Sequence, residues 1–233
     1  MASAVAVARA RAGAQVVELV GPAGAGKSSI ARALGALDPQ SRSGLGLWGL
    51  PRRLLLEGAK SLASPVARAA WAGHPLRPAA VGQMVRVGAL ARAVDRAAVA
   101  GCDRLVLDEG PVFALAWLDV FFGTNGDRGW AQWRTDTLGA WARRLDAVVQ
   151  LDASDATLAA RIRTRAKPHM VKDRPDREIF AFSERFRRAF GRVVGELDAT
   201  GRVVVLRVRT DGADAPETAA LLRPLLEDAR RGR

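Results

Sequence analysis

The sequence GPAGAGKS, residues 21–28, decides which fold the chain adopts. It matches the pattern G-x-x-x-x-G-K-[ST] and follows the β-branched run Gln15–Val20, which predicts a strand. The next residues, Lys27–Leu37, predict a helix. Glycines permit backbone angles that let successive N–H groups point inward, and the start of a helix adds partial positive charge. The stretch therefore predicts a loop that cradles phosphate groups.

Each residue of this loop has an expected part in binding a nucleoside triphosphate. The Lys27 ammonium is expected to bridge the β- and γ-phosphates, and the Ser28 hydroxyl is expected to bind Mg²⁺. A chance glycine-rich turn is the alternative, but the strand before it and the helix after it argue against that. The predicted nucleotide-binding residues are Gly21, Ala23, Gly24, Ala25, Gly26, Lys27, Ser28 and Ser29.

A second apolar strand, Asp103–Leu107, is followed by two acids, Asp108 and Glu109. In folds with a phosphate-binding loop, the neighbouring strand delivers an acid to the metal, so Asp108 is expected to bind Mg²⁺ directly or through water. Glu109 is a candidate general base for a hydroxyl or a water. Gly110 and Pro111 predict a turn that keeps both acids at the edge of the sheet. The alternative for both is a solvated strand end that caps the next helix.

A basic segment follows another predicted strand, Asp146–Leu151. Arg161 and Arg165 are four residues apart and share one face of a predicted helix, so they are candidates for clamping a phosphoryl group in transfer. The Pro-rich, basic stretch after them predicts a lid over about residues 161–177 that excludes water. The alternative is a solvated basic helix and loop in an arginine-rich chain.

Strands alternate with helices along the chain, and the strands are nearly continuous in apolar residues. This pattern predicts an α/β fold with a parallel sheet covered on both faces. We expect one domain over residues 15–233 after a flexible tail at residues 1–14. The five predicted strands are Gln15–Val20, Gly44–Trp48, Asp103–Leu107, Asp146–Leu151 and Arg202–Val208.

The net charge of +12 suits either nucleic acid or an anionic small molecule. However, four residues account for all the lysine, and a chain rich in Arg, Ala and Gly is typical of a GC-rich genome. We therefore do not expect the protein to bind nucleic acid. The chain also has no tyrosine, a residue on which the bases of single strands commonly stack. The single cysteine, Cys102, precludes an internal disulfide and favours a cytoplasmic protein.

The sequence holds no apolar run long enough to cross a bilayer, so no membrane association is expected. The sequence does not decide between a monomer and a homodimer, because the apolar helix faces within residues 51–100 suit a core or an interface equally.

The order of these parts resembles the nucleoside and nucleotide kinases, most closely the thymidylate kinase group. Three stretches carry the resemblance: GPAGAGKS at 21–28, the strand that ends at Asp108, and LDASDATLAARIRTR at 151–165. The resemblance implies a three-layer sandwich of the P-loop NTPase type, with a five-stranded parallel sheet, helices on both faces and a basic lid. It also implies Mg·ATP as the phosphoryl donor and a small acceptor that bears a hydroxyl or a phosphate.

The resemblance extends to individual positions. Arg161 and Arg165 fall on the arginines of the lid helix, and the turn around Asp211 falls where such kinases pack the adenine. Arg86 lies near the place of an acceptor-binding arginine. Glu109 departs from the family, which has arginine after the acid at Asp108, and no clear acid follows the predicted strand Gly44–Trp48. The sequence therefore predicts a divergent relative with its own acceptor site.

The function that these features favour is an ATP- and Mg²⁺-dependent phosphotransferase that acts on a small molecule, such as a nucleoside, a nucleotide or a related compound. An ATPase or a nucleotide-dependent switch coupled to a partner protein is the alternative. The adjacent acids Asp108 and Glu109 resemble the metal ligand and base of such motors. A kinase that acts on the ends of polynucleotides is a further alternative, which only the positive net charge supports.

Overall fold

The computed structural model describes residues 13–71, 77–99, 101–123 and 128–231. The predicted tail at 1–14 falls mostly outside these residues. One sheet of five parallel strands forms the middle of the molecule, in the order β2-β3-β1-β4-β5. The strands are β1 (Gln15–Val20), β2 (Ser41–Leu45), β3 (Arg104–Asp108), β4 (Ala147–Asp152) and β5 (Val204–Arg209).

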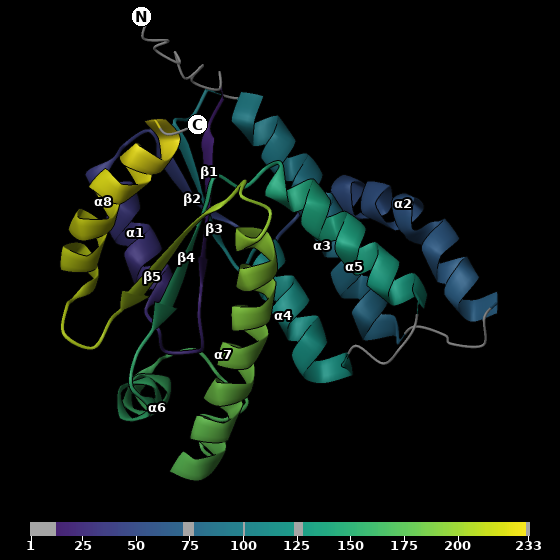
Figure 1. Ribbon diagram of the computed structural model, residues 1–233. Coiled ribbons are helices and arrows are strands. Elements are labelled where there is room, and N and C mark those ends of the chain that lie inside the picture. The colour runs from purple at the N-terminus through teal and green to yellow at the C-terminus, as the bar shows by residue number, and fades with distance from the viewer. Residues whose placement is uncertain (1–12, 72–76, 100, 124–127, 232–233) are drawn as a thin grey trace, which may run out of the picture.

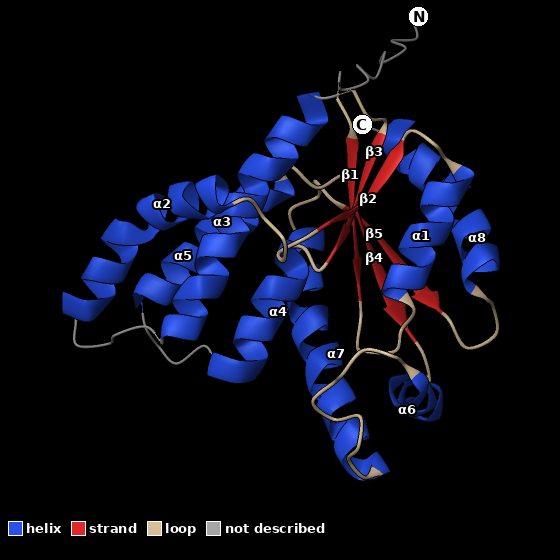
Figure 2. Ribbon diagram, turned by 180° about the vertical axis from the view of Figure 1, so that it is seen from behind, coloured by secondary structure: helices blue, strands red, loops and turns tan. Residues whose placement is uncertain are grey.

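Helices cover both faces of the sheet and make three layers (Figures 1 and 2). One face carries α1 (Lys27–Leu37) and α8 (Ala215–Arg231), which pack against each other. The opposite face carries α3 (Pro78–Val99), α4 (Pro111–Phe122), α5 (Arg128–Ala142) and α7 (Asp176–Asp198). Outside these layers, α2 (Arg52–Trp71) packs on α3, and α6 (Asp155–Thr164) lies beyond the end of β4. The predicted α/β three-layer fold is confirmed.

The central strand β1 links the two halves of the core. Val17 and Leu19 belong to the apolar cluster under α1 and α8, and Val16 and Val20 belong to the cluster under α3, α4 and α7. This alternation follows from the period of two in a strand. Because β1 lies in the middle of the sheet, the loop that leaves it emerges at the centre of the carboxyl edge.

The second strand differs from its predicted bounds. It runs over Ser41–Leu45, where Gly44–Trp48 was predicted. Apolar content guided the prediction, yet β2 is an edge strand with exposed residues at 42–44, and only pairing with β3 defines it. The pairing shifts register between Ser43 and Leu45. Residues 46–48 follow β2 and lie against the end of β3 at the carboxyl edge, where Leu47 N donates to the Glu109 carbonyl oxygen.

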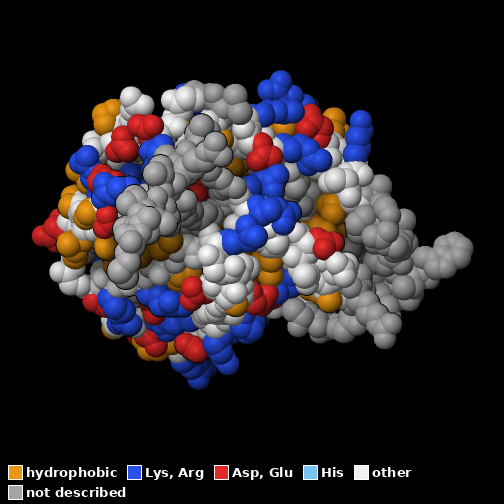
Figure 3. Space-filling view, turned by 45° about the horizontal axis from the view of Figure 1, so that its top comes forward, with side chains coloured by type: hydrophobic (Ala, Val, Ile, Leu, Met, Phe, Trp, Pro, Cys, Tyr) orange, Lys and Arg blue, Asp and Glu red, His pale blue; other side chains and the backbone are white. Residues whose placement is uncertain are grey.

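The surface mixes charges of both signs. Figure 3 views the molecule with the amino edge of the sheet brought forward, and Lys and Arg side chains there are interspersed with Asp and Glu. Many arginines form ion pairs, among them Arg144 with Asp95 and Arg223 with Glu227. In the described part of the chain, no helix has the length and apolar character needed to span a membrane.

Candidate active site

The phosphate-binding loop lies in close contact with the end of β4 and with α6. At Gly21, an added Cβ would lie 2.2 Å from the Leu151 carbonyl oxygen. At Gly24, where φ is +84°, it would lie 2.9 Å from the Leu158 carbonyl oxygen. Only glycine fits at such distances. The helix α1 begins directly after Gly26, so its first N–H groups face the interior of the loop.

Lys27 lies inside this loop. Its Nζ donates to the carbonyl oxygens of Gly21 at 2.7 Å and Pro22 at 3.0 Å. Burial lowers the pKa of the Lys27 ammonium, whereas the charges of Asp108 and Glu109 raise it. The lysine and both acids predicted from the sequence are therefore close enough to interact.

Ser28 and Asp108 come together across 80 residues of sequence. The Ser28 hydroxyl donates to Asp108 Oδ2 at 2.6 Å. The reason is the register of the central strands, which pairs Leu19 of β1 with Asp108 at the end of β3. A hydroxyl and one carboxylate fit Mg²⁺, which usually keeps several waters and completes its shell with phosphate oxygens. Among the described residues, no group of three His, Cys, Asp or Glu side chains forms an all-protein metal site.

Glu109 has an unusual backbone conformation. Its φ is +63°, and it is the one non-glycine residue of the described chain with positive φ. Its carbonyl oxygen accepts a hydrogen bond from Leu47 N at 3.1 Å, and its carboxyl group accepts one from the Trp48 side chain. Burial and the charge of Asp108 raise the pKa of Glu109, while Lys27 and Trp48 oppose that shift. Strained backbone of this kind concentrates at functional sites.

The two arginines of the predicted clamp differ in their surroundings. Arg161 donates to Gly24 O at 3.3 Å, to Thr210 Oγ1 at 2.9 Å and to Thr210 O at 2.7 Å. Its guanidinium thus ties the loop to the turn after β5. The charge of Arg165 acts on Lys27 and lowers the pKa of that ammonium. Arg165 is therefore the arginine of the pair whose charge reaches the interior of the loop.

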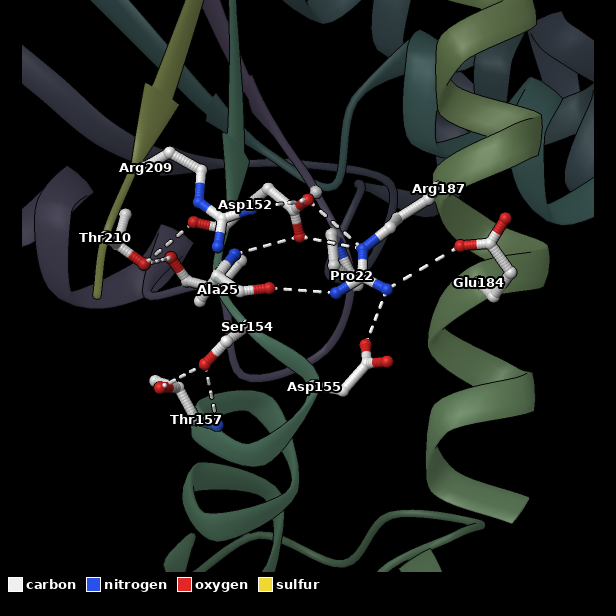
Figure 4. Close-up of polar contacts among 12 residues, drawn as sticks. Pro22, Ala25, Asp152, Ser154, Asp155, Thr157, Glu184, Arg187, Arg209 and Thr210 are labelled. Atoms are coloured by element: carbon white, nitrogen blue, oxygen red, sulfur yellow. Dashed lines mark hydrogen bonds and ion pairs between the residues drawn. The ribbon is translucent and has the colours of Figure 1, made fainter. Parts of the chain in front are cut away.

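The turn predicted to pack the adenine lies beside α6. Asp211 Oδ1 accepts a hydrogen bond from Ser154 N at 2.7 Å, which holds its pKa below the usual range. Ser154 in turn caps α6 by accepting from Thr157 N (Figure 4). The Asp211 carboxylate thus helps to place the start of α6, which bears Arg161. Arg165 is the C-cap residue, with extended backbone beyond the last helical residue, so the predicted shared helix face of the two arginines is wrong.

Arg86, the predicted acceptor-binding residue, stacks on Trp48. Its guanidinium carbon lies 4.6 Å from the centre of the indole ring. Trp48 is 57% exposed, which is rare for a tryptophan, and the same side chain bonds to Glu109. An aromatic ring and a cation therefore adjoin the candidate base.

Comparisons with known proteins were made on sequence and on structure. No protein-family model matches the chain, and no curated protein matches it. Among solved structures, a deoxyadenosine kinase from M. mycoides with dCMP and dCDP bound is similar, with a TM-score of 0.55 and 14% identity. The match covers 92% of this chain and 100% of that one. A thymidylate kinase from Candida albicans is similar with a TM-score of 0.56 and 13% identity, covering 95% of this chain and 94% of that one.

The chain has a P-loop kinase fold. The neighbours also include the M. mycoides enzyme with dATP bound, at a TM-score of 0.53 and 15% identity. At these identities the likeness establishes the fold of the chain, and residue roles have to be argued from the local geometry.

Two features of this P-loop kinase fold escaped prediction from the sequence. Arg187 of α7 donates to Asp152, Asp155 and the Ala153 carbonyl oxygen, and so joins α7 to the junction of β4 and α6 (Figure 4). Glu18 lies fully buried in β1. An isolated acid in an apolar strand was the only available signal for Glu18, and Arg187 was one arginine among many.

His169 lies within the segment predicted to form the lid, residues 161–177. It is half-buried, with its ring 5.4 Å from that of Phe182 in an edge-on contact. Burial, Arg165 and Lys27 lower the pKa of its imidazole. The predicted lid thus packs against α7, with the His169 ring close enough to Arg165 and Lys27 to feel their charges.

Proposed function

We propose that the protein is an ATP- and Mg²⁺-dependent phosphotransferase that acts on a small molecule. The observation that carries the proposal is the contact between Ser28 and Asp108 at 2.6 Å beside Lys27. It unites a hydroxyl, a carboxylate and an ammonium at a loop whose glycines allow close packing against the end of β4 and against α6. The P-loop kinase fold supports the proposal.

On the donor side, Lys27 neutralises charge on the β- and γ-phosphates, and the N–H groups at the start of α1 bind phosphate oxygens. Ser28 and Asp108 are the residues that hold Mg²⁺, which when bound neutralises phosphate charge and orients the γ-phosphate. Arg161 orders the loop through Gly24 and Thr210, and Arg165 stabilises the phosphoryl group in transfer.

On the acceptor side, Glu109 orients the acceptor hydroxyl and accepts its proton. The stacked pair of Trp48 and Arg86 offers a flat apolar face and a cation next to that base. This combination suits an acceptor with a ring and an anionic or strongly polar group, a class that includes nucleosides, nucleotides and related compounds. The segment 161–177 closes over the triphosphate and excludes water.

The proposal is tested by measuring ADP formation from Mg·ATP alone and with a panel of nucleosides, nucleotides, sugars and hydroxy acids. We expect slow hydrolysis alone and acceptor-dependent turnover with a member of the panel. Rapid hydrolysis without any acceptor would instead support the second candidate function, an ATPase coupled to a partner. That candidate is favoured by the adjacency of Asp108 and the strained Glu109, which also suits activation of a water.

A further inference from the structure

One buried acid has no part in the mechanism above. Glu18 lies in the middle of β1, in register with Leu107 of β3 and Val148 of β4. Its neighbours on the same face of the strand, Val16 and Val20, belong to the apolar cluster under α3, α4 and α7. This position therefore predicts an apolar side chain. Burial of a carboxyl group is unfavourable unless hydrogen bonds satisfy it.

The hydrogen bonds of Glu18 come from the first turn of α4. Its Oε2 accepts from Val112 N at 3.0 Å, and its Oε1 accepts from Phe113 N at 3.0 Å. The N-cap residue of this helix is Gly110, which has no side chain to cap with, and Pro111 has no N–H. A side chain from the central strand thus takes the part that a capping residue normally has.

The contact between Glu18 and the start of α4 is very close. A Cβ added to Gly110 would lie 2.7 Å from Glu18 Cδ and 2.9 Å from each carboxyl oxygen. Glycine at 110 is therefore required for the approach, and the pairing of Glu18 with Gly110 is a matched feature of two distant segments. The backbone N–H groups of Phe113, Val112 and Gly110 also lower the pKa of Glu18 against the effect of burial.

Gly110 is the last residue of the turn that follows β3, and the other side of the same turn is fixed as well. Glu109 O accepts from Leu47 N, and a Cβ added to Gly46 would lie 2.2 Å from the Asp108 carbonyl oxygen. Glu109 keeps its positive φ between these two attachments. A strained conformation persists only where the surroundings determine it fully.

We infer that Glu18 is a positioning residue of the proposed site: its carboxyl group holds the start of α4 and so fixes the turn that bears Asp108 and Glu109. The inference rests on the proposed function for the roles of those two acids. The nucleotide loop is fixed by other contacts, from Lys27, Arg161 and Thr210. Loss of Glu18 therefore disturbs the metal ligand and the base and spares binding of the phosphates.

The test compares Glu18→Gln with Gln15→Leu. Glutamine has the shape of glutamate but replaces one acceptor oxygen by an NH₂ group, which opposes an N–H of the helix. Gln15 is a matched control, because it is also a buried polar residue of β1. Its side chain bonds to Leu226 O and Arg104 at the opposite end of the strand. Both variants lose buried hydrogen bonds, and only the first one touches the turn.

Three measurements separate positioning from plain stability. In Glu18→Gln we expect faster hydrogen exchange at the amides of Val112 and Phe113, and ATP affinity without Mg²⁺ within about twofold of the wild type. We expect the gain in ATP affinity on adding Mg²⁺ to fall by about tenfold, as is common for residues that support a metal ligand. Gln15→Leu should leave both the exchange at those amides and the Mg²⁺ effect unchanged.

With an active acceptor, Glu18→Gln should lower kcat by about 10- to 100-fold. The double variant with Glu109→Gln should then lose less than the two single losses combined, because part of the effect of Glu18→Gln passes through Glu109. Unchanged exchange and an unchanged Mg²⁺ effect in Glu18→Gln would overturn the inference, as would equal losses in Gln15→Leu. If no acceptor is found, the proposed function fails, while the exchange and Mg²⁺ measurements still decide the role of Glu18.

Discussion

At the scale of single residues, the proximity of Lys27, Ser28 and Asp108 could be predicted, and the contacts that support them could not. Lys27, Ser28 and Asp108 stand in patterns whose chemistry depends on residue type and on position at strand ends, and the structure brings the three together. Glu18 and the positive φ of Glu109 depend on contacts across the sheet. A sequence pattern does not record such contacts, because the partners lie far apart along the chain.

We predict that Lys27→Ala weakens ATP binding and turnover together. The half-buried ammonium lies inside the loop proposed to bind the phosphates, so its loss removes a full positive charge from that site. ATP affinity should fall by about 10- to 100-fold, which corresponds to roughly 1.4–2.8 kcal/mol. Isothermal titration calorimetry measures the affinity. Lys60→Ala, at a surface position on α2, is the control, and wild-type affinity in Lys27→Ala would contradict the assigned role.

We predict that Glu109→Gln lowers kcat by about 100-fold or more, because loss of a general base typically costs that much. ATP affinity should stay near the wild-type value, since Glu109 acts on the acceptor. Steady-state kinetics and a binding titration separate the two effects. Full activity in the variant would remove Glu109 from the mechanism.

We predict a pH-dependent contribution of Glu18 to stability. Burial raises its pKa from 4.5 to about 8, so the folded state holds a proton that the unfolded state releases near pH 4.5. The contribution is fully present below pH 4.5 and is lost as the pH rises through about 8. Across that window it changes by about 1 kcal/mol per pH unit. Urea unfolding measures the free energy of unfolding of the wild type and of Glu18→Gln. The advantage of the wild type should decrease as the pH rises from 5 to 8, and a difference that stays constant with pH would contradict this.

At the scale of elements, the helices with strong periodicity and the buried strands were predicted well from the sequence. The edge strand and the junctions between elements were not. The bounds of β1 and α1 match their predicted ranges, because apolar runs and the glycine loop delimit them. The edge strand β2 was misplaced, since pairing with β3 alone defines it. The junction of α6 and α7 depends on Arg187, a side chain that the sequence could not distinguish from its neighbours.

We predict that Arg187→Met loosens α6. Arg187 is mostly buried and bonds to Asp152, Asp155 and the Ala153 carbonyl oxygen. Its loss should cost about 2 kcal/mol, which lowers Tm by roughly 4–8 °C in a chain of this size. Faster hydrogen exchange in α6 should accompany the loss.

The control for this prediction is Arg188→Met. Arg188 is 65% exposed at its side chain and pairs with Glu184 on the same helix. Its replacement should change stability by less than about 0.5 kcal/mol. If calorimetry gave the same loss of stability for both substitutions, the hydrogen bonds of Arg187 would contribute no more to the free energy of unfolding than the exposed ion pair of Arg188.

At the scale of the whole molecule, the alternation of strands and helices predicted the parallel sheet and its two helical faces, and the structure confirms both. The acceptor side was harder to predict, because Trp48, Arg86 and Glu109 come from three separate segments that only the tertiary fold unites. Their residue types follow no spacing rule.

We predict that Mg·ATP stabilises the whole domain, because a ligand that binds only the folded state shifts the unfolding equilibrium by mass action. At a ligand concentration of about 100 times Kd the gain is about 2.7 kcal/mol, or roughly 5–10 °C in Tm. Differential scanning fluorimetry with ATP plus EDTA, and with Mg·AMP, provides the controls. An equal shift with ATP in EDTA would argue against a metal at Ser28 and Asp108.

The central place of β1 has a consequence for how the chain is made. Its partners β3 and β4 begin at residues 104 and 147, so a ribosome has to synthesise most of the protein before the first strand has neighbours on both sides. At about 5–20 residues per second, this leaves a nascent chain with an unpaired apolar strand for many seconds. Closing such long loops is also slow in free solution. The loop at residues 21–28 is synthesised early, yet it is expected to be among the last parts to acquire its shape, because β1 has to pair first.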